Sequence, residues 1–392
     1  MLNRTLARQA VRSLAVSKIR EVANAGMGRD GLLPFWFGEP DTVTPALIRA
    51  AGMASIDAGE TFYAQNLGIP ALRDALARYG ARLHGGSHGR CAAENTAVTS
   101  SGMNALMLCE QALIAPGDRV VVVTPVWPNL VEGPRILGAE VVELPLAFGP
   151  QGWQLDLQQL LDALTPDTRL LMVNSPNNPT GWTMPRGQQR AVLAHCRTHG
   201  IWILADDAYE RLYFEGEPGV AVSPAFQDLG DEDDRLVTVN TFSKAWQMTG
   251  WRLGWITAPA ALVKDLATLI EFNTSCAPTF VQRAGVVAVE QGEPIVASFV
   301  GRLKACRDFL VPRLQALPRI QAVSPPGAMY AFFRVEGMND SLSFCKALAA
   351  EHGLGLAPGA AFGAEGEGYL RWCFAATEDR LDEGLRRLAR AL

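Results

Sequence analysis

The sequence lacks the glycine-rich motifs with which many enzymes bind nucleotides. It contains no GxxxxGK[ST] loop, which would cradle a nucleoside triphosphate, and no GxGxxG turn after its first predicted strand, which would hold a dinucleotide. It also contains no GxSxG motif in the strand-to-helix setting that carries the nucleophilic serine of α/β-hydrolases, because its one GxSxG string, Gly85–Gly89, follows a predicted helix. These absences exclude P-loop NTPases and nicotinamide-dependent dehydrogenases, and they leave no basis for a serine hydrolase.

Residues that form disulfides and metal sites are scarce and scattered. There are seven cysteines, an odd number, and no two of them form a CxxC pair, which predicts reduced thiols in a cytoplasmic protein. There are only five histidines. His195 and His199 lie four residues apart on a predicted helix, but no glutamate stands between them as in a zinc protease, so we expect no metal site.

The sequence also lacks long apolar runs and strongly basic clusters. No stretch approaches the ~18 apolar residues of a membrane-spanning helix, which predicts no membrane association. Lys and Arg number 35 against 40 Asp and Glu, and a net charge of −5 predicts no binding to nucleic acid. The basic first 20 residues favour an amphipathic N-terminal helix; a transit peptide is the alternative interpretation.

What the chain does contain is enough apolar sequence for two domains. Its 392 residues are 48% hydrophobic and 19% charged. Buried strands such as Arg119–Val123, Leu170–Val173 and Leu236–Val239 alternate with helical patterns, which predicts an α/β fold with a mostly parallel mixed sheet and helices on both faces. A long helical region from Leu262 to about Leu317 and a few further elements predict a smaller α+β domain at the end of the chain.

Polar residues that bear chemistry follow the predicted strands. Ligands of open α/β sheets bind at the carboxyl ends of the strands, where these residues would gather. Small residues in Thr99–Asn104 join a strand to a helix and suit an anion. Asp206 ends one strand and can pair with a cation, and Lys244 follows another, where desolvation can make it nucleophilic. Arg371 lies in an apolar strand and needs a partner.

Together these residues suggest a phosphorylated carbonyl cofactor that is held as a Schiff base. At this point the sequence resembles the fold-type I enzymes that use pyridoxal 5′-phosphate (PLP), specifically the class I/II aminotransferases, over about residues 17–392. The resemblance rests on motifs in the family's order and spacing: Ser17–Val22 (SKIREV), Phe37–Asp41 (FGEPD), Tyr63 with Gly68–Arg73, Asn174–Gly181 (NSPNNPTG), Asp206–Tyr209, Thr241–Lys244, Met248–Gly254 and Arg371.

The resemblance implies a domain organisation and an assembly. Residues 45–285 would form the large PLP-binding domain, residues 286–392 the C-terminal small domain, and residues 1–44 an N-terminal arm with part of the small domain. The protein would be a homodimer with composite active sites. In this arrangement Tyr63 would reach the cofactor phosphate of the neighbouring subunit, while Lys244 would serve its own chain.

The resemblance also implies roles for single residues. Lys244 would bind PLP as a Schiff base and carry the proton between carbons. Asp206 would pair with the pyridine nitrogen, and Tyr209, assisted by Asn178, would hydrogen-bond the ring oxygen. Arg371 would bind the substrate α-carboxylate by a bidentate fork. The other implied cofactor residues are Ser101, Gly102, Met103, Trp127, Thr241, Ser243 and Arg252, and the other implied substrate residues are Gly38, Asn178 and Ile19.

The implied activity is transfer of an amino group from an L-amino acid to a 2-oxo acid, by a ping-pong mechanism through pyridoxamine phosphate. A PLP-dependent lyase or synthase, for example a β-eliminating enzyme, would use the same cofactor residues and is the alternative. A non-catalytic PLP-binding regulator is more distant, because it needs a DNA-binding domain for which few residues precede Ser17.

One position departs from the family's pattern. In the bacterial aspartate branch a lysine that helps to recognise acidic substrates commonly stands where this sequence has Met103. No second arginine is evident for a distal carboxylate. Ile19, Phe35, Met103 and Trp127 instead predict a tolerant, largely apolar side-chain pocket, and therefore poor use of aspartate.

Overall fold

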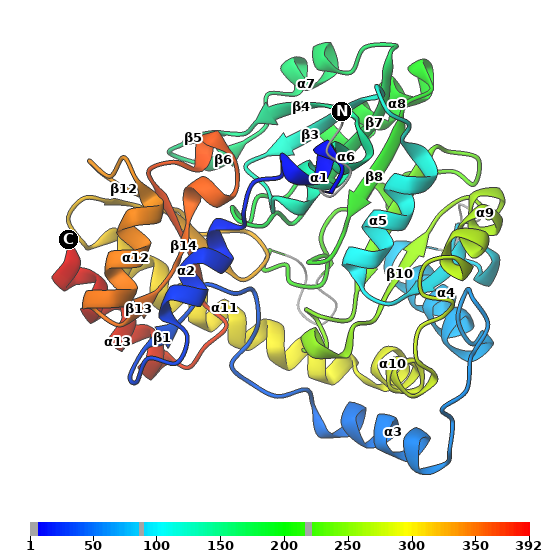
Figure 1. Cartoon of the computed structure of the whole chain (residues 1–392), viewed down its shortest axis with the longest axis horizontal. Coiled ribbons are helices and arrows are strands. Elements are labelled where there is room, and N and C mark those ends of the chain that lie inside the picture. The colour runs from blue at the N-terminus through cyan, green and yellow to red at the C-terminus, as the bar shows by residue number, and fades with distance from the viewer. Residues whose placement is uncertain (1–6, 86–89, 216–221) are drawn as a thin grey trace.

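A seven-stranded mixed sheet lies at the centre of the larger part of the molecule in the computed structural model, which describes residues 7–85, 90–215 and 222–392 (Figure 1). Only β10 runs antiparallel to its neighbours, so the predicted fold class is confirmed. The order across the sheet is β2 (Thr96–Thr99), β10 (Gly254–Thr257), β9 (Leu236–Thr241), β8 (Trp202–Asp206), β7 (Thr168–Asn174), β3 (Arg119–Thr124) and β4 (Glu140–Pro145).

Both faces of this sheet are buried. Along β3, Val121 and Val123 enter one apolar cluster while Val120 and Val122 enter another, because successive side chains of a strand point to opposite faces. This explains the continuous apolar runs in the sequence. The helices of this part are α3 (Ala46–Asp57), α4 (Pro70–His84), α5 (Gly102–Leu113), α6 (Asn129–Leu137), α7 (Leu157–Ala163), α8 (Arg186–His199), α9 (Ala260–Glu271) and α10 (Thr279–Gln291).

The smaller part of the molecule is built from a segment near the N-terminus and from the C-terminal segment of the chain. An antiparallel sheet of order β11-β12-β15-β14 forms its centre, β1 pairs with β13, and α2 packs on α12 (Figure 1). Its elements are α2 (Lys18–Gly26), β1 (Leu33–Pro34), β11 (Ile320–Gln321), β12 (Tyr330–Val335), α12 (Ser341–Glu351), β13 (Leu354–Gly355), β14 (Ala357–Pro358), β15 (Tyr369–Cys373) and α13 (Glu378–Ala391), and a hairpin of β5 (Ala147–Gly149) and β6 (Gly152–Gln154) lies nearby.

The N-terminal helix expected over the first 20 residues is interrupted. Residues 1–6 lie outside the described residues, α1 covers only Gln9–Arg12, and α2 begins at Lys18. The break has a local cause, since the Ser17 hydroxyl accepts the backbone N–H of Arg20 and so caps the start of α2. A non-helical segment, residues 13–17, therefore connects the two helices and ends at this cap.

The long helical region expected from Leu262 to Leu317 is three helices: α9, α10 and α11 (Glu293–Gln315). Pro278 stands directly before α10 and helps to separate it from α9. A proline has no backbone N–H to donate, and it disfavours the helical conformation of the residue before it. The expected division of the chain at residues 44/45 and 285/286 stays a prediction, and its second boundary falls inside α10. No helix in the described ranges has both the length and the apolar character to cross a membrane.

Candidate active site

A cavity of about 640 Å³ opens at the carboxyl ends of the parallel strands, and side chains from the smaller part of the molecule complete its wall. The register of the sheet places these ends side by side: Asn174 pairs with Asp206, and Asp206 with Val239. Most residues predicted for the site line this cavity. They are Ile19, Gly38, Gly102, Met103, Trp127, Asn178, Asp206, Tyr209, Thr241, Ser243, Lys244, Arg252 and Arg371.

Lys244 projects into the cavity three residues after the end of β9. Its Nζ donates a hydrogen bond to the carbonyl of Gly38 (2.6 Å) and lies 5.5 Å from the centre of the Tyr209 ring. Burial lowers the pKa of Lys244 to about 8, because a desolvated ammonium is less stable than a hydrated one. The side chain is therefore a half-buried amine that readily becomes neutral and nucleophilic.

Asp206 lies opposite the amine, at the last position of β8. It is buried, its Oδ1 accepts the backbone N–H of Ala208 (3.2 Å), and burial raises the pKa of its carboxyl to about 6 while the positive charge of Lys244 opposes this rise. A cation placed beside it would stabilise the ionised form. The carboxyl group thus suits a positively charged ring nitrogen.

Arg371 brings an almost fully buried positive charge to the cavity. Its Nη1 donates to Asn178 Oδ1 (2.8 Å), its Nη2 donates to the carbonyl of Trp36, and its Nε has no partner. The guanidinium also lies 4.5 Å from the Tyr330 ring centre. These partners carry no formal charge, and a buried charge without a counter-ion is costly. The arrangement therefore favours a carboxylate ligand.

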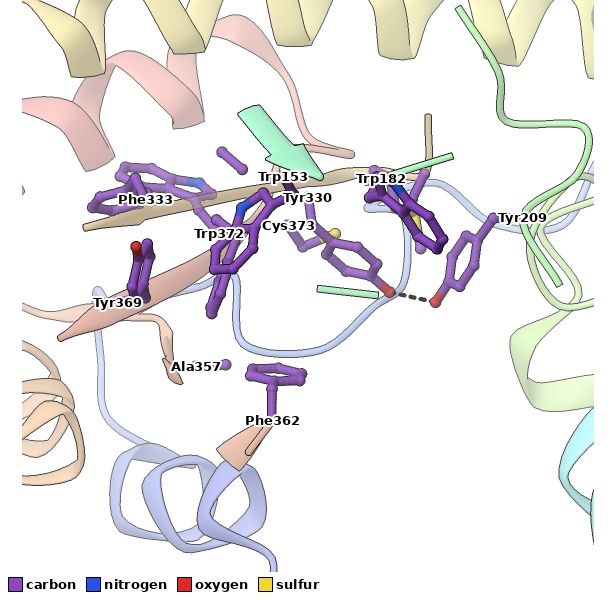
Figure 2. Packing of buried hydrophobic residues seen from close by; sticks show 14 of the residues in the cluster. Trp153, Trp182, Tyr209, Tyr330, Phe333, Ala357, Phe362, Tyr369, Trp372 and Cys373 are labelled. Carbon is purple, nitrogen blue, oxygen red and sulfur yellow. Dashed lines mark hydrogen bonds between the residues drawn. The ribbon is translucent and has the colours of Figure 1, made fainter. Parts of the chain in front are cut away.

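Tyr209 and Tyr330 join the two parts of the molecule. Their hydroxyl oxygens lie 2.6 Å apart, and Figure 2 shows the two hydroxyl groups joined by this hydrogen bond; the ring planes are inclined at 74°. Sequence reasoning missed Tyr330, because nothing in an apolar strand marks one tyrosine as facing a cavity. The same residue explains the glycine of the FGEPD motif, since a Cβ at Gly38 would collide with the Tyr330 hydroxyl.

The start of α5 and the turn after β9 form an anion-binding cup. Close packing requires glycine here, because a Cβ at Gly254 would lie 2.5 Å from the backbone nitrogen of Gly102. The Thr241 and Ser243 hydroxyls are 2.9 Å apart, and Arg252 lines the same end of the cavity. Free N–H groups at a helix start, hydroxyls and a guanidinium together suit a phosphate.

Two residues predicted for the site do not line the cavity. The Ser101 hydroxyl accepts the backbone N–H of Asn104 (3.0 Å), so it caps α5. Ser101 also has a positive φ of 132°, which holds the turn into the helix in a strained conformation. Tyr63 is 91% exposed on the surface of its own chain. Its predicted role in a neighbouring subunit stays a prediction.

The expected side-chain pocket needs two corrections. Phe35 is buried in the small part of the molecule, with its ring centre 5.0 Å from that of Trp372, and Phe37 lines the cavity in its place. Besides Arg252 and Arg371, a further arginine lines the cavity: Arg20 is exposed and its guanidinium lies 4.7 Å from the centre of the Phe37 ring. Sequence reasoning missed this arginine, because α2 and the FGEPD segment meet only in the fold.

Met103 lines the cavity beside Trp127 and Ile19, as expected. Its sulfur accepts a hydrogen bond from Asn129 Nδ2 (3.1 Å), another contact that sequence reasoning missed. The Met103 thioether carries no charge, so this wall offers apolar surface where a lysine would offer an ammonium. Within the described ranges no group of three or more His, Cys, Asp or Glu is placed to hold a metal ion.

Comparison with known proteins identifies one family. The family described as aminotransferase class I and II matches residues 35–388. The chain is 30% identical to an aspartate aminotransferase from Pyrococcus horikoshii, over 96% of this chain and 94% of that protein, and 33% identical to an arginine–pyruvate transaminase from Pseudomonas aeruginosa, over 94% and 92%. A solved structure of Thermus thermophilus aspartate aminotransferase superposes with a TM-score of 0.89 at 32% identity, and covers 99% of this chain and 100% of that one.

Proposed function

Because this chain belongs to the class I and II aminotransferases and is a PLP-dependent enzyme of that family, we propose that it takes the amino group of an apolar L-amino acid and passes it to a 2-oxo acid. The relatives are named for aspartate and for arginine, so membership of the family does not determine which side chain the amino-acid substrate carries. The observation that carries the proposal is that the uncharged side chains of Met103, Trp127 and Ile19 line the same cavity as Arg371.

The residues of the cavity fit PLP. When bound, PLP supplies a reactive carbonyl and a ring that accepts electrons. Lys244 would hold it covalently, and the buried Asp206 would pair with its ring nitrogen. Tyr209, whose hydroxyl already has a hydrogen-bond partner, would contact the ring oxygen. The remaining contacts would be a stacked ring from Trp127 and a phosphate cup of Gly102, Met103, Thr241, Ser243 and Arg252.

The same residues can direct the reaction. Arg371 would hold the α-carboxylate of the substrate, and Asn178 fixes the guanidinium by its 2.8 Å hydrogen bond. The Lys244 amine, with a pKa lowered to about 8, can take a proton from the substrate Cα and deliver it to a carbon of the cofactor. The Gly38 carbonyl, 2.6 Å from Nζ, holds the amine in place. The buried site thus combines orientation with proton transfer.

Substrate preference gives the first test of the proposal. A panel of L-amino acids, scored by single-turnover loss of the PLP absorbance and by ammonia release, should show that apolar or aromatic donors react fastest and that no ammonia appears. Met103→Lys should raise kcat/KM for aspartate by roughly tenfold, the ratio that corresponds to ~1.4 kcal/mol. Arg20 is exposed to solvent, so we expect its charge to be screened. A wild-type enzyme whose best donor is aspartate or glutamate contradicts the proposal.

Arg371 gives the second test. Arg371→Ala should lower kcat/KM for amino acids by roughly 30-fold or more, because loss of one partner of a buried charge pair costs ~2–5 kcal/mol. Arg371→Lys should recover only part of this loss, since an ammonium cannot reproduce the two-pronged contact. The matched control is Arg78→Ala on the exposed face of α4, which should change nothing. Unchanged amino-acid kinetics in Arg371→Ala would leave this arginine with a structural role only.

We propose that two copies of the chain form a homodimer with shared sites. Large apolar side chains are exposed on α3, on the segment after it and at the end of α9, and Asn66 of that segment donates a hydrogen bond to Glu271 of α9 (2.6 Å). An exposed apolar patch of this kind supports an interface. The exposed residues are Leu47, Met53, Ile56, Phe62, Tyr63 and Phe272.

Hybrid dimers give the third test. A chain with Lys244→Ala and a chain with Tyr63→Ala, each weakly active alone, are unfolded and refolded together. Random pairing makes about half of the dimers hybrid with one intact site of two, so roughly a quarter of wild-type activity should return. The hybrids are confirmed with differently tagged chains. If Tyr63 acts within its own chain, no hybrid site is intact and activity stays at the level of the separate variants.

We propose a cytoplasmic location for the enzyme. All seven cysteines are free, and five of them are buried, as is usual for proteins of a reducing compartment. Titration of the folded enzyme with a thiol reagent should therefore label the two partly exposed cysteines, Cys91 and Cys276, ahead of the others. Fractionation of the native cell gives the direct measurement, and recovery of the enzyme from an oxidising compartment contradicts the proposal.

A further inference from the structure

A second cavity adjoins the first. It encloses about 700 Å³ between the N-terminal segment, α5, α6 and the loop that follows β14. It shares five lining residues with the active-site cavity, and we call these residues the partition. The shared residues are Ser17, Ile19, Met103, Trp127 and Asn129.

The partition is mainly apolar and can move. Met103 has three rotatable bonds and is held at its sulfur by one weak hydrogen bond from Asn129. Trp127 and Ile19 complete the apolar rim. Because these are the residues that form the uncharged wall of the active site, a side chain that leaves the active site in this direction enters the second cavity.

The far wall of the second cavity also offers apolar surface. Met107 of α5 and Val131 and Ile136 of α6 line it without lining the active site. Its charged groups already have partners. Arg135 bonds both Glu132 (2.8 Å) and Glu143 (2.7 Å), Lys18 donates to the Ala360 carbonyl, and Glu367 accepts the backbone N–H of Ser341 (2.7 Å). Carboxylates that are already paired have little left to offer a cationic ligand. The free surface is therefore suited to methylene groups.

The cover of this cavity is thin. Residues 14–17, between α1 and α2, line it without regular structure, and Val16 is 78% exposed. The segment is fastened at its ends, where Arg8 Nη2 donates to the Ile136 carbonyl (3.0 Å) and Lys18 Nζ donates to the Ala360 carbonyl (3.0 Å). Such a cover can shift outward to admit a long chain while its fastenings hold.

We propose that the second cavity receives the end of a long, unbranched apolar side chain of the amino-acid substrate, whose α-carboxylate is held at Arg371. This inference rests on the proposed function and adds a substrate class to it: straight-chain L-2-amino acids longer than the active site alone accommodates. The partition at Met103 would open to pass the chain, and Met107 and Ile136 would contact its end.

The test is a homologous series of straight-chain L-2-amino acids of five to nine carbons. Each added methylene should raise kcat/KM by about threefold to fourfold, the ratio that corresponds to the burial of one CH₂. Met107→Trp and Ile136→Trp fill the cavity from two different helices, and either should abolish the rise while leaving the five-carbon substrate within about twofold of wild type. Met27→Trp is the matched control at an exposed site outside both cavities, and it should keep the full rise.

Inhibition by straight-chain monocarboxylates measures the same binding without turnover. Their inhibition constants should fall with chain length in wild type and stay flat in Met107→Trp. A fall of kcat/KM with length in wild type, a rise that persists in both filled variants, or a stronger preference for arginine than for the straight-chain series would overturn the proposal. If no amino acid reacts at all, the proposed function fails, and the carboxylate series still decides whether the cavity binds a chain.

Discussion

Replacement of Lys244 by alanine should abolish transamination and leave a folded protein that binds PLP non-covalently. The amine supplies two functions that no other group in the cavity replaces, covalent attachment and proton transfer. Loss of proton transfer alone lowers enzymatic rates by roughly 10²–10⁴-fold, and loss of the nucleophile adds to this. We therefore expect a fall of at least about 10⁴-fold in kcat, with an unchanged circular dichroism spectrum.

Borohydride reduction followed by peptide mapping identifies the attachment site. In the wild-type enzyme the cofactor should appear on the peptide that contains Lys244, and in Lys244→Ala it should appear on none. Lys264→Ala is the matched control, because Lys264 is an exposed lysine on α9 outside the cavity. Its activity should equal that of wild type. A cofactor attached at Lys264, or substantial turnover by Lys244→Ala, would refute the assignment.

The pH dependence of PLP capture offers a readout that does not depend on turnover. Only the neutral amine attacks a carbonyl, and burial lowers the pKa of Lys244 to about 8. The rate at which the apoprotein captures PLP should therefore rise with pH and level off above about 8. An exposed lysine would show the rise near pH 10.4 instead. A rate that keeps rising past pH 10 would show that the amine is not desolvated.

The positions of residues at strand ends could be predicted from the sequence. Asp206 and Lys244 each follow a buried apolar run, and parallel strands bring their ends to one edge, so the local pattern sufficed to place them together. The glycines at positions 38 and 102 are also marked by motifs. Their physical reasons, the Tyr330 hydroxyl and the tight approach of Gly254, appear only in the fold.

Contacts between segments that are distant in the chain could not be predicted from the sequence pattern. Arg371 and Asn178 are 193 residues apart in the chain, and no spacing rule predicts their hydrogen bond. The exchange of Phe35 for Phe37 in the cavity wall depends on how the segment after β1 packs against Trp372. The predicted N-terminal helix was too long because no proline or glycine interrupts the first 20 residues, while the cap at Ser17 starts a new helix.

Replacement of Asp206 by asparagine should lower kcat/KM by roughly 10²–10³-fold, the loss expected when one charge that stabilises a transition state is removed. A neutral amide cannot keep a ring nitrogen protonated, so the ring accepts electrons less well. Asp206 suits this task because it is buried, faces the cavity and keeps a carboxyl whose pKa burial raises to about 6, a group that a neighbouring cation would ionise.

Asp207 provides a matched control at the next position. It does not line the cavity; its carboxyl is buried among Glu210, Asp228 and the protonated His84, and its Oδ2 has no hydrogen-bond partner. Burial and the negative charge of Glu210 raise the pKa of Asp207 well above its usual value. Because Asp207 does not line the cavity, Asp207→Asn should leave kcat/KM within about threefold of wild type.

A cofactor analogue separates electrostatics from packing at Asp206. PLP methylated at its ring nitrogen carries a fixed positive charge and needs no carboxylate to retain it. Asp206→Ala leaves room for the methyl group, so reconstitution of this variant with the methylated analogue should recover activity by at least about tenfold over reconstitution with PLP. Wild type should lose activity with the same analogue, because the methyl group displaces the nitrogen from the Asp206 carboxylate. If Asp207→Asn is the damaging change and Asp206→Asn is mild, Asp206 is not the partner of the ring nitrogen; if the analogue rescues nothing, Asp206 acts through packing and not through its charge.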